Sequence, residues 1–280
     1  MNNSIPEIRL NDGLTLPVIG FGTAAVIGNE GANAVDQAIH AGYRLIDTAY
    51  NYENEGTVGE AVRRSSVPRQ ELRITSKLPG RYHEYEKAVP AIQESLYRAG
   101  LDYYDLYLIH WPNPKQGHYV EAWQALIEAK KWGLVRSIGV CNFLPEHLEH
   151  LEKETGVKPS INQIELHPYF NQEESRKWHE KHDIQTESWS PLAKASDVLQ
   201  DETLRKIANN HNKTVSQIIL RWHYQLGTIP IPKSMSPRRQ IENLSIFSFA
   251  LDEGEMEMLA SLTQPAGRIN DQDPAVYEEF

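Results

Sequence analysis

The 280-residue chain contains little cysteine and no long apolar run. Its one cysteine, Cys141, has no partner within the chain, which excludes an internal disulfide and favours a reducing compartment. No apolar stretch approaches the ~20 residues that span a bilayer. The N-terminal stretch MNNSIPEIRL lacks the cationic and apolar regions of a secretory signal. We therefore expect a cytoplasmic protein that does not associate with membranes.

The chain also lacks an excess of basic charge. It has 38 Asp and Glu residues against 28 Lys and Arg residues, and a formal net charge of −10. Nucleic-acid binding requires a basic face, so we expect no nucleic-acid partner. Hydrophobic residues make up 40% of the chain, which suffices for a large core and excludes disorder. Nothing in the sequence indicates an obligate interface, and we expect a monomer.

Short apolar runs alternate with longer stretches of helical periodicity. Runs rich in Ile, Leu and Val, without clean alternation, suit parallel strands buried on both faces. The predicted strands are Val18–Gly22, Arg44–Asp47, Leu72–Lys77, Leu106–His110, Val135–Cys141, Ile161–Glu165, Ile184–Ser188 and Thr228–Pro230. Before them, Ile8–Leu10 and Leu14–Val18 flank an Asn-Asp-Gly turn and predict a β-hairpin.

The stretches between the strands have the apolar spacing of amphipathic helices, as in Ala88–Leu96, Trp123–Lys130 and Val215–Leu226. Four of them are followed by a glycine, the residue favoured at a helix C-terminus: Gly42, Gly100, Gly133 and Gly156.

Eight strands alternating with helices predict an α/β fold. We expect a (β/α)8 TIM barrel with an N-terminal β-hairpin, extra helices near the C-terminus, and a tail from Ser261 on. Residues 1–280 are predicted to form one domain. A doubly wound sheet is the alternative, but Gly20-Phe21-Gly22-Thr23-Ala24-Ala25 contains no G-x-G-x-x-G motif.

Four chemically different side chains lie at or just after predicted strand ends. Asp47, Lys77 and His110 end three consecutive strands, and Tyr52 follows Asp47 in the next loop. Taken singly, Asp47 could be a helix cap, Lys77 a solvated strand end and His110 a histidine of the core. Because the C-terminal strand ends of a barrel surround one mouth, the combination predicts a site.

These residue types suit proton delivery to a carbonyl oxygen. A tyrosine has a pKa near 10, which a nearby ammonium lowers, while a carboxylate holds the ammonium in place. A histidine can orient and polarise a carbonyl oxygen. The set could therefore donate a proton to that oxygen as hydride reaches the carbon.

The pairs His147/His150 and His179/His182 lack a third ligand, so we expect no metal.

Three stretches resemble motifs of the aldo-keto reductase superfamily. Gly42–Glu55 (GYRLIDTAYNYENE) is similar to the first signature, and Leu106–Pro112 (LYLIHWP) to the middle motif. Ile231–Ser234, continuing through Arg239 to Asn243, is similar to the cofactor signature. The resemblance covers essentially the whole chain. It is greatest to the bacterial 2,5-diketo-D-gluconic acid reductase and glyoxal reductase branch, chiefly because the C-terminal tail is short.

The resemblance implies a barrel that binds NADPH/NADP without a Rossmann fold. Tyr52 would be the general acid, Lys77 and Asp47 would tune it, and His110 would orient the carbonyl. The substrate pocket would include Ala24, Tyr52, His110 and Trp111, with Trp111 as its wall.

The implied cofactor contacts run from the nicotinamide to the adenine. The residues carried over are Thr23 and Asp47; Cys141, Asn142 and Gln163 for the carboxamide; Trp189 for stacking on the nicotinamide; Ser190 and Leu192 for the pyrophosphate; Lys233, Ser234 and Arg239 for the 2′-phosphate; and Glu242 and Asn243 for the adenine. Lys233, Arg238 and Arg239 form a cationic cluster in an acidic chain, so we expect a preference for NADPH over NADH.

Two positions depart from the family pattern. Cys141 replaces a serine of many relatives, and a thiol is the weaker hydrogen-bond donor. Ala24 lies near a position that is often aromatic in bacterial relatives, which implies a more open pocket.

The leading hypothesis is an NADPH-dependent oxidoreductase that reduces small aldehydes, α-dicarbonyls or keto sugars to alcohols. A non-catalytic NADPH-binding regulatory protein on the same fold is the alternative, although it would not need all four site residues. A barrel isomerase or hydrolase leaves the phosphate-binding cluster and Trp189 unexplained.

Overall fold

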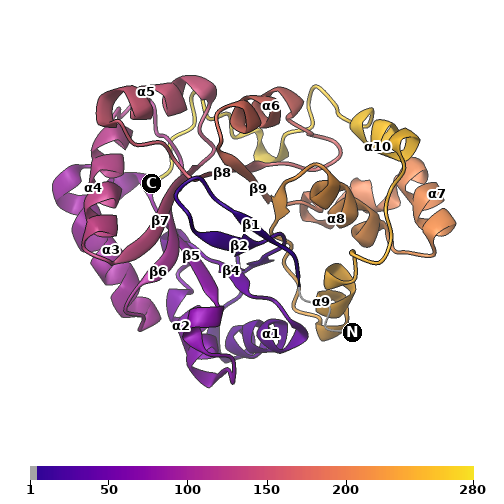
Figure 1. Cartoon of the computed structure of the whole chain (residues 1–280), viewed down its shortest axis with the longest axis horizontal. Helices are drawn as coiled ribbons and strands as arrows, with labels where there is room; N and C mark the ends of the chain where they lie inside the picture. Colours follow the sequence, from indigo (N-terminus) through magenta and orange to yellow (C-terminus); the bar gives the residue numbers. More distant parts are fainter. Residues whose placement is uncertain (1–4) are drawn as a thin grey trace.

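The computed structural model describes residues 5–280, which contain an eight-stranded parallel sheet with its strands in chain order. Figure 1 shows these strands at the centre, with the helices arranged around them. The strands are β3 (Phe21–Gly22), β4 (Leu45–Asp47), β5 (Arg73–Leu78), β6 (Tyr104–Ile109), β7 (Val135–Cys141), β8 (Ile161–Glu165), β9 (Gln185–Trp189) and β10 (Ile229–Pro230). The predicted (β/α)8 fold is confirmed.

Two glycines close the barrel between its first and last strands. Gly20 N–H donates to the carbonyl oxygen of Pro230 at 3.0 Å, and Gly22 N–H to that of Pro232 at 3.1 Å. A Cβ at Gly20 would lie 2.5 Å from Ile231 Cδ1, and one at Gly22 would lie 3.0 Å from Ile231 O. The two segments approach too closely for side chains here, which explains the Gly-x-Gly spacing.

Strand ends differ from prediction mostly by one or two residues. The first strand differs more, because β3 covers Phe21–Gly22 rather than Val18–Gly22. The N–H of Val18 donates to Pro6 O at 3.0 Å, so this part of the chain continues the path of the hairpin.

The predicted hairpin is confirmed and covers one end of the barrel (Figure 1). Its strands are β1 (Glu7–Arg9) and β2 (Thr15–Pro17), which pair antiparallel. Gly13 has a φ of +93° in the connecting turn, a backbone angle that glycine adopts readily. Leu10 and Leu16 belong to the apolar cluster that fills the barrel interior. The hairpin therefore seals this end with leucine side chains.

Helices cover the outside of the sheet and bury an apolar core against it. They are α1 (Gly28–Ala41), α2 (Glu55–Arg64), α3 (Tyr85–Ala99), α4 (Tyr119–Lys131), α5 (Pro145–Thr155), α6 (Glu173–Lys181), α7 (Glu202–His211), α8 (Val215–Gln225), α9 (Pro237–Leu244) and α10 (Glu253–Ala260). Gly100 and Gly156 end α3 and α5 in the left-handed conformation, as expected of capping glycines.

The extra helices predicted near the C-terminus are present. Both α7 and α8 lie between β9 and β10, and α9 and α10 follow β10. From Ser261 on, the chain forms a single 3₁₀ turn, Ile269–Asp271, and no α-helix. Among residues 5–280, no helix has the length and hydrophobicity required to cross a membrane.

Candidate active site

The four predicted catalytic residues gather at the C-terminal end of the barrel. Asp47 ends β4, Lys77 lies near the end of β5, His110 follows β6, and Tyr52 lies in the 3₁₀ turn Tyr50–Tyr52. Lys77 Nζ lies 2.6 and 2.7 Å from the two carboxylate oxygens of Asp47. It also lies 5.2 Å from the centre of the Tyr52 ring. The His110 and Tyr52 rings meet edge to face, with centroids 5.8 Å apart.

Lys77 is buried completely, and its ammonium is held by three acceptor atoms. Besides the two Asp47 oxygens, the carbonyl oxygen of Thr48 accepts a hydrogen bond at 2.9 Å. Burial alone would lower the pKa of Lys77, but the charge of Asp47, followed by Tyr52, raises it above the ordinary value. Lys77 is therefore a cation at neutral pH.

The pKa of Tyr52 differs from the sequence-based expectation. Burial of the hydroxyl is the largest cause and raises the pKa to about 12. Lys77 lowers this pKa, as expected, whereas Asp47 raises it. The expected net lowering is therefore wrong for this structure, because desolvation outweighs the ammonium. Tyr52 is a neutral phenol that retains its proton.

The residues predicted at the nicotinamide end form a connected hydrogen-bond chain. Trp189 Nε1 donates to Asn142 Oδ1 at 2.8 Å, and Asn142 Nδ2 donates to His110 O at 3.0 Å. Asn142 has a φ of +61°, a conformation that asparagine tolerates better than most residues. Gln163 Nε2 donates to Asp47 Oδ2 at 3.0 Å and to Glu187 Oε2 at 2.6 Å. Asn142 and Gln163 thus contact proposed catalytic residues directly, and Trp189 is linked to His110 through Asn142.

Two smaller predicted residues, Thr23 and Cys141, are fully buried. The Thr23 hydroxyl donates to the backbone oxygen of Asp47 at 2.8 Å. Cys141 ends β7 and belongs to the interior apolar cluster. Burial raises the pKa of its thiol well above the ordinary value, so Cys141 is a neutral side chain.

The residues predicted to bind the 2′-phosphate lie at and just before the start of α9. Arg239 and Glu242, which were both predicted, line a hollow of about 560 Å³ together with Thr214, Ser236 and Arg238. A helix N-terminus with two guanidinium groups beside it is a suitable place for a phosphate.

The other residues predicted to contact this part of the cofactor do not line the hollow. Lys233 Nζ donates to the backbone oxygen of Ala24 at 2.9 Å and so links the first and last barrel loops. Ser234 accepts a hydrogen bond from Ser236 N, and Asn243 is buried beside Tyr43. Ser190 has a φ of +48° just after β9, and Leu192 is half-buried in the same loop.

The C-terminal tail adds residues that the sequence analysis did not assign to the site. The ring of Tyr277 lies 4.5 Å from that of Trp111, measured between centroids. Glu279 Oε1 lies 2.7 Å from His110 Nδ1. No periodicity or motif of the last residues indicates that they return to the barrel mouth.

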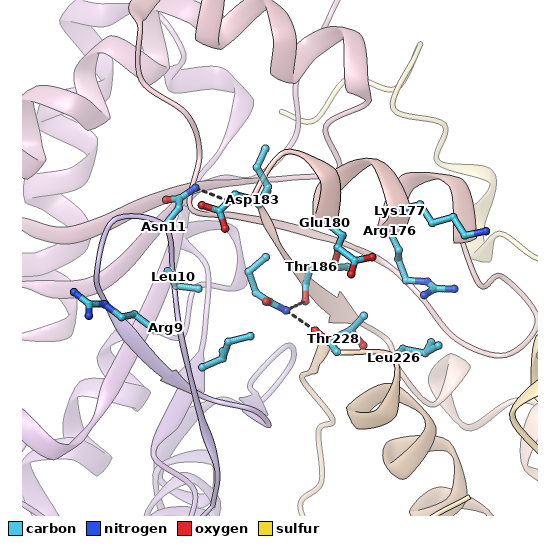
Figure 2. Close-up of a pocket in the computed structure, with 14 residues that line it drawn as sticks. Arg9, Leu10, Asn11, Arg176, Lys177, Glu180, Asp183, Thr186, Leu226 and Thr228 are labelled. Atoms are coloured by element: carbon cyan, nitrogen blue, oxygen red, sulfur yellow. Dashed lines mark hydrogen bonds between the residues drawn. The ribbon is translucent and has the colours of Figure 1, made fainter. Parts of the chain in front are cut away.

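A different cavity of about 300 Å³ lies beside the hairpin, and none of the predicted site residues lines it. Figure 2 shows Arg9 and Asn11 of the hairpin region on one side of the view, and Arg176, Lys177 and Glu180 of α6, which also line the cavity, on the other.

The four histidines considered for metal binding have protein neighbours. His179 is buried between Thr186 and Asn162, and the Nδ1 of His150 faces the Tyr119 hydroxyl at 2.7 Å. Within the part of the chain that the structure describes, no group of three or more His, Cys, Asp or Glu side chains has the arrangement of a metal site.

Comparison with known proteins identifies a family and several close relatives. The model of the aldo/keto reductase family matches residues 18–264. The 2,5-diketo-D-gluconic acid reductase B of Corynebacterium sp. (strain SHS752001) is 51% identical over 99% of both chains. The methylglyoxal reductase DkgA of Escherichia coli (strain K12) is 46% identical, over 92% of this chain and 93% of the relative.

Solved structures agree with these sequence matches. A variant of Gox0644 crystallised in complex with NADPH is 44% identical to this chain. It has a TM-score of 0.93 and covers 99% of this chain and 100% of its own. This chain therefore shares its fold with a relative that binds NADPH.

Proposed function

The chain belongs to the aldo/keto reductase family, and on that premise we propose that it reduces small carbonyl compounds with NADPH. Tyr52 supplies the proton, and the product is an alcohol. The observation that carries this proposal is the pairing of Lys77 with Asp47 at 2.6 Å, next to Tyr52 and opposite His110.

Each of the four residues has a task that follows from its surroundings. Asp47 holds the Lys77 ammonium near Tyr52, where positive charge stabilises the phenolate that forms as the proton leaves. Because burial keeps the free phenol protonated, the proton is available when a carbonyl oxygen arrives. His110 orients that oxygen from the other side of the site.

NADPH supplies the hydride when bound, and the residues present fit such a cofactor. The hydrogen bond from Trp189 to Asn142 holds the indole and the amide together beside the catalytic end, which suits a nicotinamide with its carboxamide. Arg238 and Arg239 at the start of α9 suit the 2′-phosphate that distinguishes NADPH from NADH. The cofactor would thus extend from Gln163 to α9 across the barrel mouth.

The proposed substrates are α-dicarbonyls such as methylglyoxal, keto sugar acids and small aldehydes. The names of the relatives from Corynebacterium and Escherichia coli support the first two classes. Trp111 is buried beneath Tyr277 and forms one wall next to His110, while Ala24 is exposed at the opposite loop. A pocket with one aromatic wall and one open side suits compact, polar carbonyl compounds.

The direct test is NADPH oxidation, followed by absorbance, with methylglyoxal, 2,5-diketo-D-gluconate or an aromatic aldehyde. The Tyr52→Phe variant removes the phenolic proton and keeps the ring, so we expect turnover to fall by about 10²-fold or more. NADPH binding, measured by fluorescence quenching, should remain within about twofold of the wild type, since Tyr52 makes no contact that holds the phosphate end.

Other results would favour the alternatives. Tight NADPH binding without reduction of any of the three substrates would support the non-catalytic regulator. Absence of NADPH binding would refute the cofactor assignment and leave a barrel isomerase or hydrolase. Equal turnover by wild type and Tyr52→Phe would remove Tyr52 from the role of acid.

A further inference from the structure

The loop after β7 is held in place by a buried asparagine of the neighbouring strand β8. Asn142, the proposed carboxamide-binding residue of this loop, has a φ of +61°, and its N–H donates to Gln163 O at 2.9 Å. At the next residue, Phe143 N–H donates to Asn162 Oδ1 at 3.3 Å, and Phe143 O accepts from Asn162 Nδ2 at 2.8 Å. Asn162 therefore binds both backbone polar groups of the residue that follows Asn142.

These contacts fix the orientation of the Asn162 amide and the tautomer of a buried histidine. A backbone N–H only donates and a backbone oxygen only accepts, so Phe143 determines which amide atom of Asn162 is the oxygen. The nitrogen, Nδ2, also donates to His179 Nε2 at 3.0 Å. Nε2 is therefore unprotonated, and the neutral ring carries its hydrogen on Nδ1, which donates to Thr186 Oγ1 at 2.9 Å.

The network is shielded from water. Asn162 and His179 are 0% exposed, and Phe143 is 2% exposed. Burial, the largest cause, lowers the pKa of His179 to about 4, which agrees with a neutral ring that accepts from Asn162. A polar group that loses its partner in such surroundings has no water to replace it. Loss of Asn162 or of its acceptor should therefore disturb the loop.

The side chain of Asn162 lies on the outer face of the sheet, away from the catalytic residues. Successive residues of a strand point to opposite faces. Gln163 contacts Asp47 inside the barrel, whereas Asn162 contacts His179 of α6 on the outside. The link from Asn162 to the catalytic end therefore runs through the backbone of Phe143.

We propose that Asn162, with His179 as its acceptor, is a positioning residue for the nicotinamide end of the cofactor site. It acts through the loop backbone, which keeps Asn142 in its left-handed conformation and in contact with Trp189 and His110. The inference rests on the proposed function, because it takes NADPH as the cofactor. It also gives a task to His179, one of the histidines that the metal hypothesis left unexplained.

The test compares two ligands by isothermal titration calorimetry on the full-length protein at pH 7. One is NADPH, and the other is adenosine 2′,5′-bisphosphate, which lacks the nicotinamide. Asn162→Leu keeps a branched side chain of similar size without polar atoms, and NADPH affinity should fall about 10-fold, as for the loss of hydrogen bonds that hold the loop. Affinity for the bisphosphate should stay within about twofold, because its phosphates would bind at α9 rather than beside Asn142.

Variants of His179 test the same link without changing Asn162, and they decide the question if Asn162→Leu does not fold. His179→Leu removes the acceptor and should lower NADPH affinity about fivefold. His179→Gln can place an amide oxygen near the position of Nε2, so NADPH affinity should return to within about twofold of the wild type.

The matched control is Ser160→Ala. Ser160 is also buried, and its hydroxyl donates to Ile138 O at 2.8 Å, away from the loop of Asn142. This variant loses a comparable bond between the two strands. Its affinity for both ligands should stay within about twofold of the wild type.

The route through Asn142 is tested in the Asn142→Gly background, because glycine adopts a φ of +61° readily. If Asn162 acts through Asn142, Asn162→Leu should cause no further loss of NADPH affinity there. An equal loss in both backgrounds would overturn the proposal.

Three other results would also overturn it. They are equal weakening of both ligands by Asn162→Leu, a loss in Ser160→Ala as large as in Asn162→Leu, and a His179→Gln variant as weak as His179→Leu. A wild type that binds neither ligand would refute the proposed cofactor and this inference with it. A wild type that binds NADPH but reduces no carbonyl compound would refute the reductase function alone, while the binding measurements still decide the role of Asn162.

Discussion

The ion pair between Lys77 and Asp47 permits a quantitative test, because both side chains are nearly or fully buried and the structure gives all their partners. Lys77 is 0% exposed and Asp47 is 4% exposed. Asp47→Asn leaves a buried ammonium without its counter-charge, and Lys77→Met leaves a buried carboxylate with Gln163 as its remaining side-chain donor. Removing one partner of such a pair costs about 3–5 kcal/mol of unfolding free energy.

The two single variants should differ in a particular direction. Burial, followed by the charge of Asp47, raises the pKa of Glu187 to about 8. Loss of the Asp47 charge therefore permits Glu187 to ionise and to compensate Lys77 in part. We therefore expect the loss of unfolding free energy to be about 3 kcal/mol in Asp47→Asn and about 5 kcal/mol in Lys77→Met. The double variant removes both charges, so its loss should be smaller than that of Lys77→Met alone.

The measurement is urea unfolding at pH 7 for the wild type, the two single variants and the double variant, with turnover of methylglyoxal in parallel. These four proteins form a double-mutant cycle, from which we expect a coupling free energy between Asp47 and Lys77 of about 3 kcal/mol or more. Turnover should be impaired in all three variants, because none keeps a paired ammonium beside Tyr52. Single-variant losses that add up in the double variant would refute the reasoning.

Two further predictions concern the cofactor end and the pH dependence of stability. Trp189→Phe keeps an aromatic ring but removes the N–H that donates to Asn142 Oδ1 at 2.8 Å. NADPH affinity, measured by fluorescence quenching, should weaken about fivefold, as expected for the loss of one hydrogen bond. Unchanged affinity would argue against this role of Trp189. Burial lowers the pKa of His223 to about 3 from the 6.5 of an unfolded chain, so this histidine contributes stability above pH 6.5 that is lost as the pH falls toward 3. The free energy of unfolding by urea should increase with pH between pH 4.5 and 6, and this increase should be smaller in His223→Asn than in the wild type by about 1.4 kcal/mol per pH unit. An equal pH dependence in the two proteins would contradict the lowered pKa of His223.

Much of the site could be predicted because barrel geometry converts chain order into spatial order. Asp47 and Lys77 end consecutive strands, and consecutive strands of a parallel barrel are neighbours, so their side chains meet at one mouth. The same rule placed His110 beside them. Strand periodicity is a local property of the sequence, which is why the eight strands and the hairpin were predicted to within a few residues.

Other features depend on distances that local pattern does not encode. Gly20 and Gly22 closely approach the segment after β10, more than 200 residues away, and only closure of the barrel shows why they are glycines. The pKa of Tyr52 depends on how deeply its hydroxyl is buried, and desolvation outweighed the ammonium that the sequence identified.

Local sequence pattern was enough to predict the order of the strands, the proposed catalytic residues at their ends and the basic cluster of the proposed cofactor region. Only the tertiary structure brought Glu279 to His110, across 169 positions of the chain. A tail without periodicity carries no local signal of its destination. Its place is decided by the fit of Asn113 and Gly80 around its backbone.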